Sequence, residues 1–195
     1  MGLLVPFTIK AKILMQQLWL NEAKELGWDD LLPSTICSEW LAFFIDMFDV
    51  EDIMFKRCKR PDNAIDNPML IIFSDASEEA YGTCAYVRWE CQDSSISTAL
   101  LCSKGKVAPT KRVSMPRLEL CAAVIGKRIF TFIDKECRYQ YSKVIFVVDS
   151  EIIHAMIQRE SYGFKTYAGV RIGEIQTATC KDAWAWADAD NNIAD

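Results

Sequence analysis

The sequence contains a single histidine, His154, and its eight cysteines include no pair spaced as Cys-x-x-Cys. Zinc sites of the finger or ribbon type need closely spaced cysteine and histidine ligands, so this class of site is excluded. Several cysteines lie in apolar segments, where a free thiol packs as a small hydrophobic side chain. We therefore expect all eight cysteines to be reduced, as they are in the cytoplasm or the nucleus.

Long apolar runs are also missing. No segment approaches the roughly 20 consecutive apolar residues of a membrane-spanning helix. The first six residues, Met1 to Pro6, contain neither a basic stretch nor a small-residue cleavage site, so they do not match a secretory signal. These absences predict an intracellular protein, cytoplasmic or nuclear, without a membrane partner.

An overall excess of basic residues is missing as well. The 22 lysines and arginines are outnumbered by 27 acidic residues, which gives the 195-residue chain a formal net charge of −5. This balance argues against a simple basic module held to nucleic acid by phosphate contacts. Basic residues are nevertheless concentrated locally, because residues 104–128 contain seven of them and a single acid, Glu119.

The pattern of apolar residues divides the chain near residues 60–68, which are rich in proline, asparagine and aspartate. Before this point, helical spacing predicts helices over residues 7–26 and 34–48, the second with Leu41 and Phe48 on its apolar stripe. We therefore expect a helical segment over residues 1–67 and a separate α/β domain over residues 68–195. Hydrophobic residues make up 51% of the sequence, which is enough for a sizeable core.

Beyond residue 68 the pattern changes to that of strands, which we expect over residues 69–73, 81–89, 96–102, 143–148 and 183–187. Helices are expected after Ser114 and after Ser150, while residues 104–112 are expected to form a basic loop. Residues 161–180 stay ambiguous because their glycines weaken a helix. This order predicts an α/β fold with a mixed sheet, an antiparallel meander followed by parallel strands that crossover helices connect.

Four acidic residues stand at informative places in this layout. Asp75 and Asp149 follow two apolar strands, and open α/β sheets bind ligands at the carboxyl ends of their strands. Glu119 lies in the first turn of a predicted helix, and Asp195 follows the last strand. Carboxylates that gather repel one another unless a cation is bound, and their hard oxygens favour Mg²⁺ or Mn²⁺. The alternative is that each aspartate only forms a turn or caps a helix.

Several short motifs carry a resemblance to a known family. They are Phe73 to Ser77 followed by Ala80-Tyr81-Gly82, then Lys104 to Pro109, Pro116 to Leu120, Val148 to Ser150 and Asn192 to Asp195. Together they resemble the ribonuclease H domain of BEL/Pao retrotransposons. Pro6 to Thr8, with Lys10 and Lys12, and Gly27 to Asp30 resemble the connection that follows reverse transcriptase in those polyproteins. The resemblance implies a ribonuclease H-like mixed sheet with flanking helices that lacks its final C-terminal helix.

The resemblance also implies a chemistry. Asp75, Glu119, Asp149 and Asp195 match the family's four metal ligands, which bind two Mg²⁺ ions (Mn²⁺ is the alternative) and cut RNA within RNA–DNA hybrids. The implied partners are such a hybrid and the reverse transcriptase and integrase portions of the same polyprotein. Ile193 departs from the family pattern, which has proline there. The competing interpretation is a catalytically inactive scaffold or nucleic-acid-binding relic of a retroelement, inactive because the domain is truncated at its C-terminus.

Two further expectations concern the basic segment and a peptidase activity associated with the same family. Basic residues near Glu119 are expected to contact the phosphates of a hybrid, the alternative being a solvated surface; they are Lys104, Lys106, Lys111, Arg112 and Arg117. An aspartic peptidase needs Asp-Thr-Gly or Asp-Ser-Gly. Both Asp75-Ala76-Ser77 and Asp149-Ser150-Glu151 lack the glycine, so no protease activity is expected.

Overall fold

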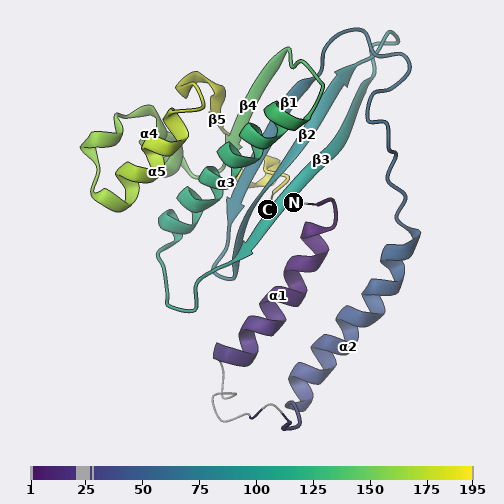
Figure 1. Ribbon diagram of the computed structural model, residues 1–195, viewed down its shortest axis with the longest axis vertical. Helices are drawn as coiled ribbons and strands as arrows, with labels where there is room; N and C mark the ends of the chain where they lie inside the picture. Colours follow the sequence, from purple (N-terminus) through teal and green to yellow (C-terminus); the bar gives the residue numbers. More distant parts are fainter. Residues whose placement is uncertain (1, 21–26, 28, 195) are drawn as a thin grey trace.

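A computed structural model describes residues 2–20, 27 and 29–194 of the chain. Figure 1 shows a sheet with helices packed against it and two N-terminal helices lying side by side. Helix α1 spans Val5–Leu20 and α2 spans Ser34–Asp49. The two helices meet through the stacked rings of Phe7 and Phe43, whose centroids are 4.6 Å apart. No helix in the described part of the chain is both long and apolar enough to cross a membrane.

The sheet has five strands in the order β3-β2-β1-β4-β5. The strands are β1 (Met69–Ala76), β2 (Ala80–Glu90), β3 (Ile96–Val107), β4 (Lys143–Val148) and β5 (Trp184–Trp186). The first three form an antiparallel meander, while β4 lies parallel to β1 and β5 lies parallel to β4. The mixed sheet that the sequence predicts is therefore confirmed, including the switch from hairpins to crossover connections.

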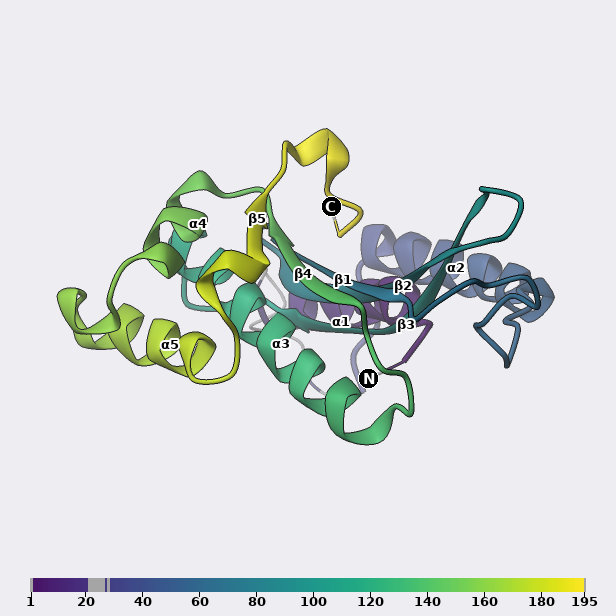
Figure 2. The ribbon, with the colours of Figure 1, turned by 90° about the horizontal axis from the view of Figure 1, so that it is seen from above.

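Three helices cover one face of this sheet (Figure 2). They are α3 (Met115–Glu136), α4 (Glu151–Gln158) and α5 (Thr166–Gln176). Leu70 and Ile72 of β1 and Phe146 of β4 point toward these helices and form the main core with isoleucines of α3, α4 and α5. We call this side the α3 face. Because side chains alternate along a strand, Phe73 points to the opposite face, where it packs with Cys84 and Val147.

Helix α3 lies very close to the sheet where its small residues face β1 and β2. A Cβ atom at Gly126 would stand 2.8 Å from Ser74 Oγ, which only the absence of a side chain permits. One turn earlier, the Thr83 hydroxyl donates a hydrogen bond of 3.0 Å to the carbonyl of Ala122. Ser74 Oγ and Thr83 Oγ1 lie 3.1 Å apart and share a buried hydrogen bond. These contacts fix the N-terminal half of α3 over the ends of β1 and β2.

Over the described residues there are also four short 3-10 helices: η2 (Val50–Asp52), η3 (Ser161–Gly163), η4 (Lys181–Ala183) and η5 (Ala189–Asn191). The segment that the sequence left ambiguous contains η3 and α5. Gly169 permits this arrangement, because a Cβ atom there would lie 2.9 Å from the carbonyl oxygen of Ser161. A glycine that weakens a helix locally thus allows that helix to pack closely against its neighbour.

The N-terminal segment is joined to the sheet. The backbones of Gly2 and Ser103 exchange two hydrogen bonds of 3.1 Å, and Gly105 of β3 faces Val5 and Ile9 of α1. Helix α1 begins at Val5, two residues before its predicted start. Residues 21–26 of the expected first helix lie outside the described residues.

One local expectation was wrong. Lys104 and Lys106 belong to β3, so the expected basic loop begins only after Val107. The apolar stripe of α2 is largely exposed, with 61% of Leu41 and 67% of Phe48 accessible to solvent. The helix itself is where the sequence placed it, but most of its stripe does not belong to the core.

Candidate functional site

Asp75 and Asp149 occupy neighbouring positions at the ends of two parallel strands. Ser74 lies directly opposite Val148 in the β1–β4 register, and each aspartate is the next residue of its chain segment. Neighbouring strands lie about 4.8 Å apart, so the two Cα atoms are close in space. By alternation both side chains follow Phe73 and Val147 to the face opposite α3, and both aspartates are half-buried. The structure thus brings together two of the predicted ligands.

The C-terminal segment returns to the same place. The Asn192 side chain is buried, with 4% of its surface exposed, and its amide Nδ2 donates a hydrogen bond of 3.2 Å to the carbonyl of Ser74. Its Oδ1 accepts one of 3.3 Å from the backbone N–H of Ala194, which packs against the Phe73 cluster. Asparagine therefore ties the last residues of the segment to the end of β1. Asp195 itself lies outside the described residues.

Glu119 approaches the end of the sheet from the other side. It lies on α3 one turn before Ala122, which is bonded to Thr83, so Glu119 projects beyond that contact toward the sheet end. Among the residues that the structure describes, no three acidic, cysteine or histidine side chains form a group suited to holding a metal ion. The role of Glu119 as a ligand stays a prediction.

A cavity of about 280 Å³ opens beside Asp75 on the face opposite α3. Its walls come from three parts of the chain: Val5 and Ile9 of α1, Cys84 and its neighbours in β2 and β3, and Ile193 near the C-terminus. Burial raises the pKa of the Cys84 thiol to about 12, so this wall of the cavity is uncharged at neutral pH. Asp75 thus borders a largely apolar space.

Sequence reasoning missed one residue that supports the site. The indole N–H of Trp186 donates a hydrogen bond of 2.8 Å to the backbone carbonyl of Asp149. The alternation of Trp184 and Trp186 indicates a strand with one packed face, and Trp184 is indeed buried and stacked on Phe146. The sequence could have indicated this contact only through the chemistry of tryptophan, because a partly buried indole N–H usually finds a hydrogen-bond acceptor.

The structure distributes the expected phosphate-binding residues over different places. Lys104 and Lys106 pair with Thr83 and Tyr81 in the β2–β3 register, so they point to the α3 face. Arg112 forms an exposed ion pair of 3.3 Å with Glu78. Arg117 lies over the ring of Tyr167, at 4.7 Å from its centroid, and Lys111 is exposed in the loop before α3. Contact of these residues with nucleic acid stays a prediction.

The model of the Pao retrotransposon-like RNaseH-like domain matches residues 1–150 of the sequence. The chain belongs to this family. The matched span contains α1 and α2 as well as Asp75, Glu119 and Asp149, whereas Asn192 lies beyond it. No match was found among curated proteins.

Solved ribonuclease H structures resemble this Pao-like domain. The N-terminal ribonuclease H domain of a Mycobacterium tuberculosis protein has 10% identity and a TM-score of 0.41, with 64% of this chain and 86% of that chain covered. For RNase H1 of Halobacterium salinarum the identity is 12%, the TM-score 0.38 and the coverage 66% and 91%. LC11-RNase H1, solved with an RNA/DNA hybrid, has 10% identity, a TM-score of 0.38 and coverage of 65% and 88%.

Proposed function

We propose that this domain is a divalent-metal-dependent nuclease that hydrolyses the RNA strand of RNA–DNA hybrids. One observation carries the proposal, namely that Asp75 and Asp149 lie next to each other at the carboxyl ends of the parallel strands β1 and β4. Ligand sites of open α/β sheets form at such ends. Membership in a retrotransposon-like RNaseH-like family supports the choice of a nucleic-acid substrate.

The residues around the two aspartates suit a hard cation. Their donors are carboxylate oxygens, which Mg²⁺ and Mn²⁺ prefer, and the nearby Cys84 thiol stays protonated and does not compete as a soft ligand. Asp75 and Asp149 would hold the ions, and Glu119 and Asp195 would complete the set. When bound, two such ions lower the pKa of the attacking water and neutralise charge on the leaving oxygen.

The protein's own part is to position these carboxylates. The Asn192 amide holds the carbonyl of Ser74, directly before Asp75, and the Trp186 indole holds the carbonyl of Asp149. Both strand ends are thus fixed by side chains that reach them from the C-terminal part of the chain. Rigid support of this kind keeps a two-carboxylate site in its working geometry.

The substrate would be recognised by shape. A-like duplexes present 2′-hydroxyls and phosphates in a wide, shallow minor groove, which proteins contact without reading sequence. In the proposed role, the basic residues Lys104, Lys106, Lys111, Arg112 and Arg117 contribute phosphate contacts around the carboxylates. The family also supports reverse transcriptase and integrase portions of one polyprotein as partners.

Cleavage of a labelled RNA–DNA hybrid in the presence of Mg²⁺ or Mn²⁺ tests the proposal. Asp149→Asn keeps the size of the side chain but removes its charge, and we expect it to lower the cleavage rate by at least about 100-fold. Asp75→Asn and Glu119→Gln should behave similarly. The matched control is Asp134→Asn, which makes the same chemical change at an exposed position of α3 and should cleave as the unmodified chain does.

Two outcomes would contradict the proposal. Cleavage that persists in Asp149→Asn would show that the activity does not come from this site. Hybrid binding without cleavage at any concentration of Mg²⁺ or Mn²⁺ would favour the alternative, a non-catalytic hybrid-binding module of the retroelement.

A further inference from the structure

A second cleft, of about 260 Å³, lies on the α3 face between α3, α5 and the ends of β2 and β3. Three cationic side chains line it: Lys106 of β3, Arg128 of α3 and Arg171 of α5. Tyr81 also lines the cleft, and it pairs in register with Ala76, the residue that follows Asp75. The cleft therefore opens at the same end of the sheet as the two aspartates, but on the other face.

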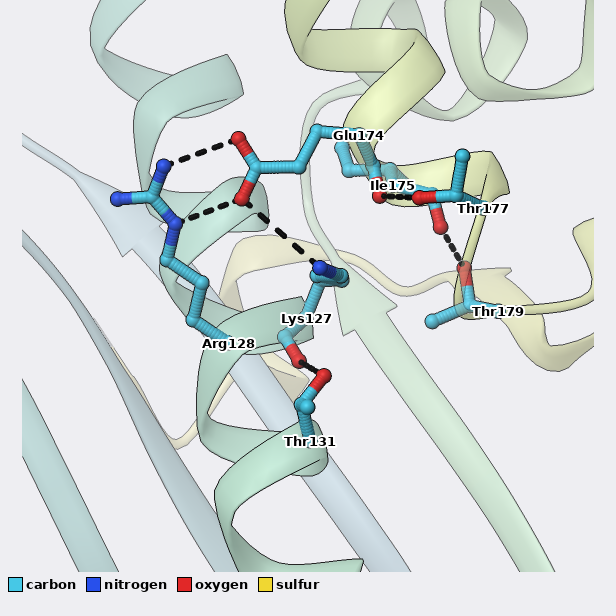
Figure 3. Close-up of polar contacts among 7 residues, drawn as sticks. All are labelled: Lys127, Arg128, Thr131, Glu174, Ile175, Thr177 and Thr179. Carbon is cyan, nitrogen blue, oxygen red and sulfur yellow. Dashed lines mark hydrogen bonds and ion pairs between the residues drawn. The ribbon is translucent and has the colours of Figure 1, made fainter.

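The carboxylate of Glu174 also lines this cleft, and it is already paired with basic side chains of α3 (Figure 3). Arg128 holds its carboxylate with two hydrogen bonds, of 2.7 and 2.9 Å, and Lys127 Nζ lies 3.9 Å away. These hydrogen bonds, together with the charges of Arg128, Lys127 and Arg171, hold the pKa of Glu174 below its ordinary value. One carboxylate therefore balances at most one of the cations around it.

Two guanidinium groups, that of Arg171 and that of Arg117 outside the cleft lining, lie over the same aromatic ring. The Cζ atoms of Arg171 and Arg117 lie 3.6 Å and 4.7 Å from the centroid of Tyr167. Arg171 Nη1 also donates a hydrogen bond of 3.0 Å to the Tyr167 carbonyl, which fixes its orientation. The Tyr167 ring attracts each cation, but it carries no charge that could balance them.

Positive charge therefore exceeds negative charge in and beside this cleft. In the part of the chain that the structure describes, no ion pair joins Lys106, Arg117 or Arg171 to a carboxylate. Gathered cations repel one another unless an anion lies among them. Fixed guanidinium groups are suited to phosphate, because their planar donors bind its oxygens in pairs.

We propose that this cleft binds a backbone phosphate of the nucleic-acid strand that runs past the carboxylate site, with Lys106 and Arg171 as its main ligands. The inference rests on the proposed function for the identity of the substrate. The volume of the cleft suits a single phosphate and its sugar, while the duplex itself stays outside. The strand is thereby held on both faces of the same sheet end.

Binding of a fluorescent RNA–DNA hybrid, measured by anisotropy with Ca²⁺ in place of Mg²⁺, tests the cleft without requiring cleavage. We expect Lys106→Gln and Arg171→Gln each to weaken binding about five- to tenfold. Each should also reduce the slope of log K against log[salt] by about one, as expected for one lost phosphate contact. The control is Lys135→Gln, which removes the same charge from an exposed position in the last turn of α3 and should bind normally.

Because Arg171 also packs on Tyr167, its variant is accepted only if its thermal unfolding matches that of the unmodified chain; Lys106 is exposed and provides the independent test. Hybrid binding that is unchanged in Lys106→Gln would overturn the inference, as would failure of the unmodified chain to bind hybrid. Inorganic phosphate distinguishes the source. If it protects the chain against unfolding while both variants bind hybrid normally, the cleft takes a free anion and the inference is wrong.

These results separate the two proposals. Normal cleavage with unaltered hybrid affinity in both variants would refute the cleft alone. Loss of hybrid affinity in the variants of a chain that does not cleave would refute the nuclease activity alone.

Discussion

Gly126 sets how closely α3 approaches the sheet, and replacing it with alanine tests that packing directly. In an exposed helix this substitution stabilises by about 1 kcal/mol, because alanine loses less backbone entropy on folding. Here the new methyl group would stand 2.8 Å from Ser74 Oγ, 3.4 Å from Ile72 Cγ2 and 3.6 Å from Thr83 Cγ2. The first distance is too short, so either the helix or the serine must move.

The cost can be estimated from these contacts. Overpacking a close contact costs about 1–3 kcal/mol. Turning the Ser74 hydroxyl away breaks its buried hydrogen bond with Thr83, which costs about 1 kcal/mol more. Set against the gain in helix propensity, Gly126→Ala should destabilise the fold by about 2 kcal/mol. With an m-value of about 2–3 kcal/mol/M, the urea midpoint should fall by about 0.7–1 M.

Two further variants make the reasoning specific. Gly173→Ala places a methyl group in α5 at an ordinary 3.6 Å from its nearest neighbour, so it should stabilise by about 0.5–1 kcal/mol. In the double variant Ser74→Ala with Gly126→Ala the short contact is gone, and its stability should return to within about 1 kcal/mol of the unmodified chain. A stabilised Gly126→Ala variant, or simple additivity in the double variant, would refute the packing explanation.

Two other predictions concern titratable groups. Glu174→Gln should cost about 0.5–1 kcal/mol at pH 7, a small value because Arg128 is half exposed and its charge is screened. The folded state lowers the pKa of Glu174, so its contribution is present above the unfolded pKa and lost as pH falls through the folded one. Urea unfolding from pH 7 to pH 3 should therefore show the two chains converging at acid pH; a constant difference would contradict this. Burial raises the pKa of Cys84 to about 12 and that of Cys102 to about 11, so both should resist alkylation by iodoacetamide at pH 8. Mass spectrometry should find label first on the exposed thiols, and early label on Cys84 would show that β2 opens readily; the exposed thiols are Cys37, Cys58 and Cys180.

The approximate ends of β1 and β4 could be predicted because an apolar run and the polar residues after it indicate where each strand stops. This pattern placed Asp149 directly after β4. Strand β1 continues to Ala76, three residues past its predicted end, so Asp75 is its penultimate residue. The adjacency of the two aspartates followed from the mixed topology, because parallel neighbours end at the same edge.

The features that the sequence did not predict depend on packing between segments that are distant in the chain. The apolar stripe of α2 predicts a helix, but nothing in its spacing distinguishes a stripe that meets the core from one that remains exposed. The basic residues form one run in sequence, yet β3 turns Lys106 toward α5 while the following loop carries Arg112 to Glu78. Arg171 was missed entirely because it joins this charge only through the α3–α5 contact.

The short β-bridge between Gly2 and Ser103 affects how readily two molecules can associate through their sheets. Strand β3 is one of the two outer strands of the sheet, and an outer strand offers unpaired N–H and C=O groups with which a strand of another molecule can pair. The backbone of Gly2 pairs with Ser103 on this edge, while α1 packs beside it against Gly105 on a face of the sheet. This pairing covers part of the β3 edge and so disfavours edge-to-edge aggregation. A chain without its first few residues would expose a longer unpaired strand edge.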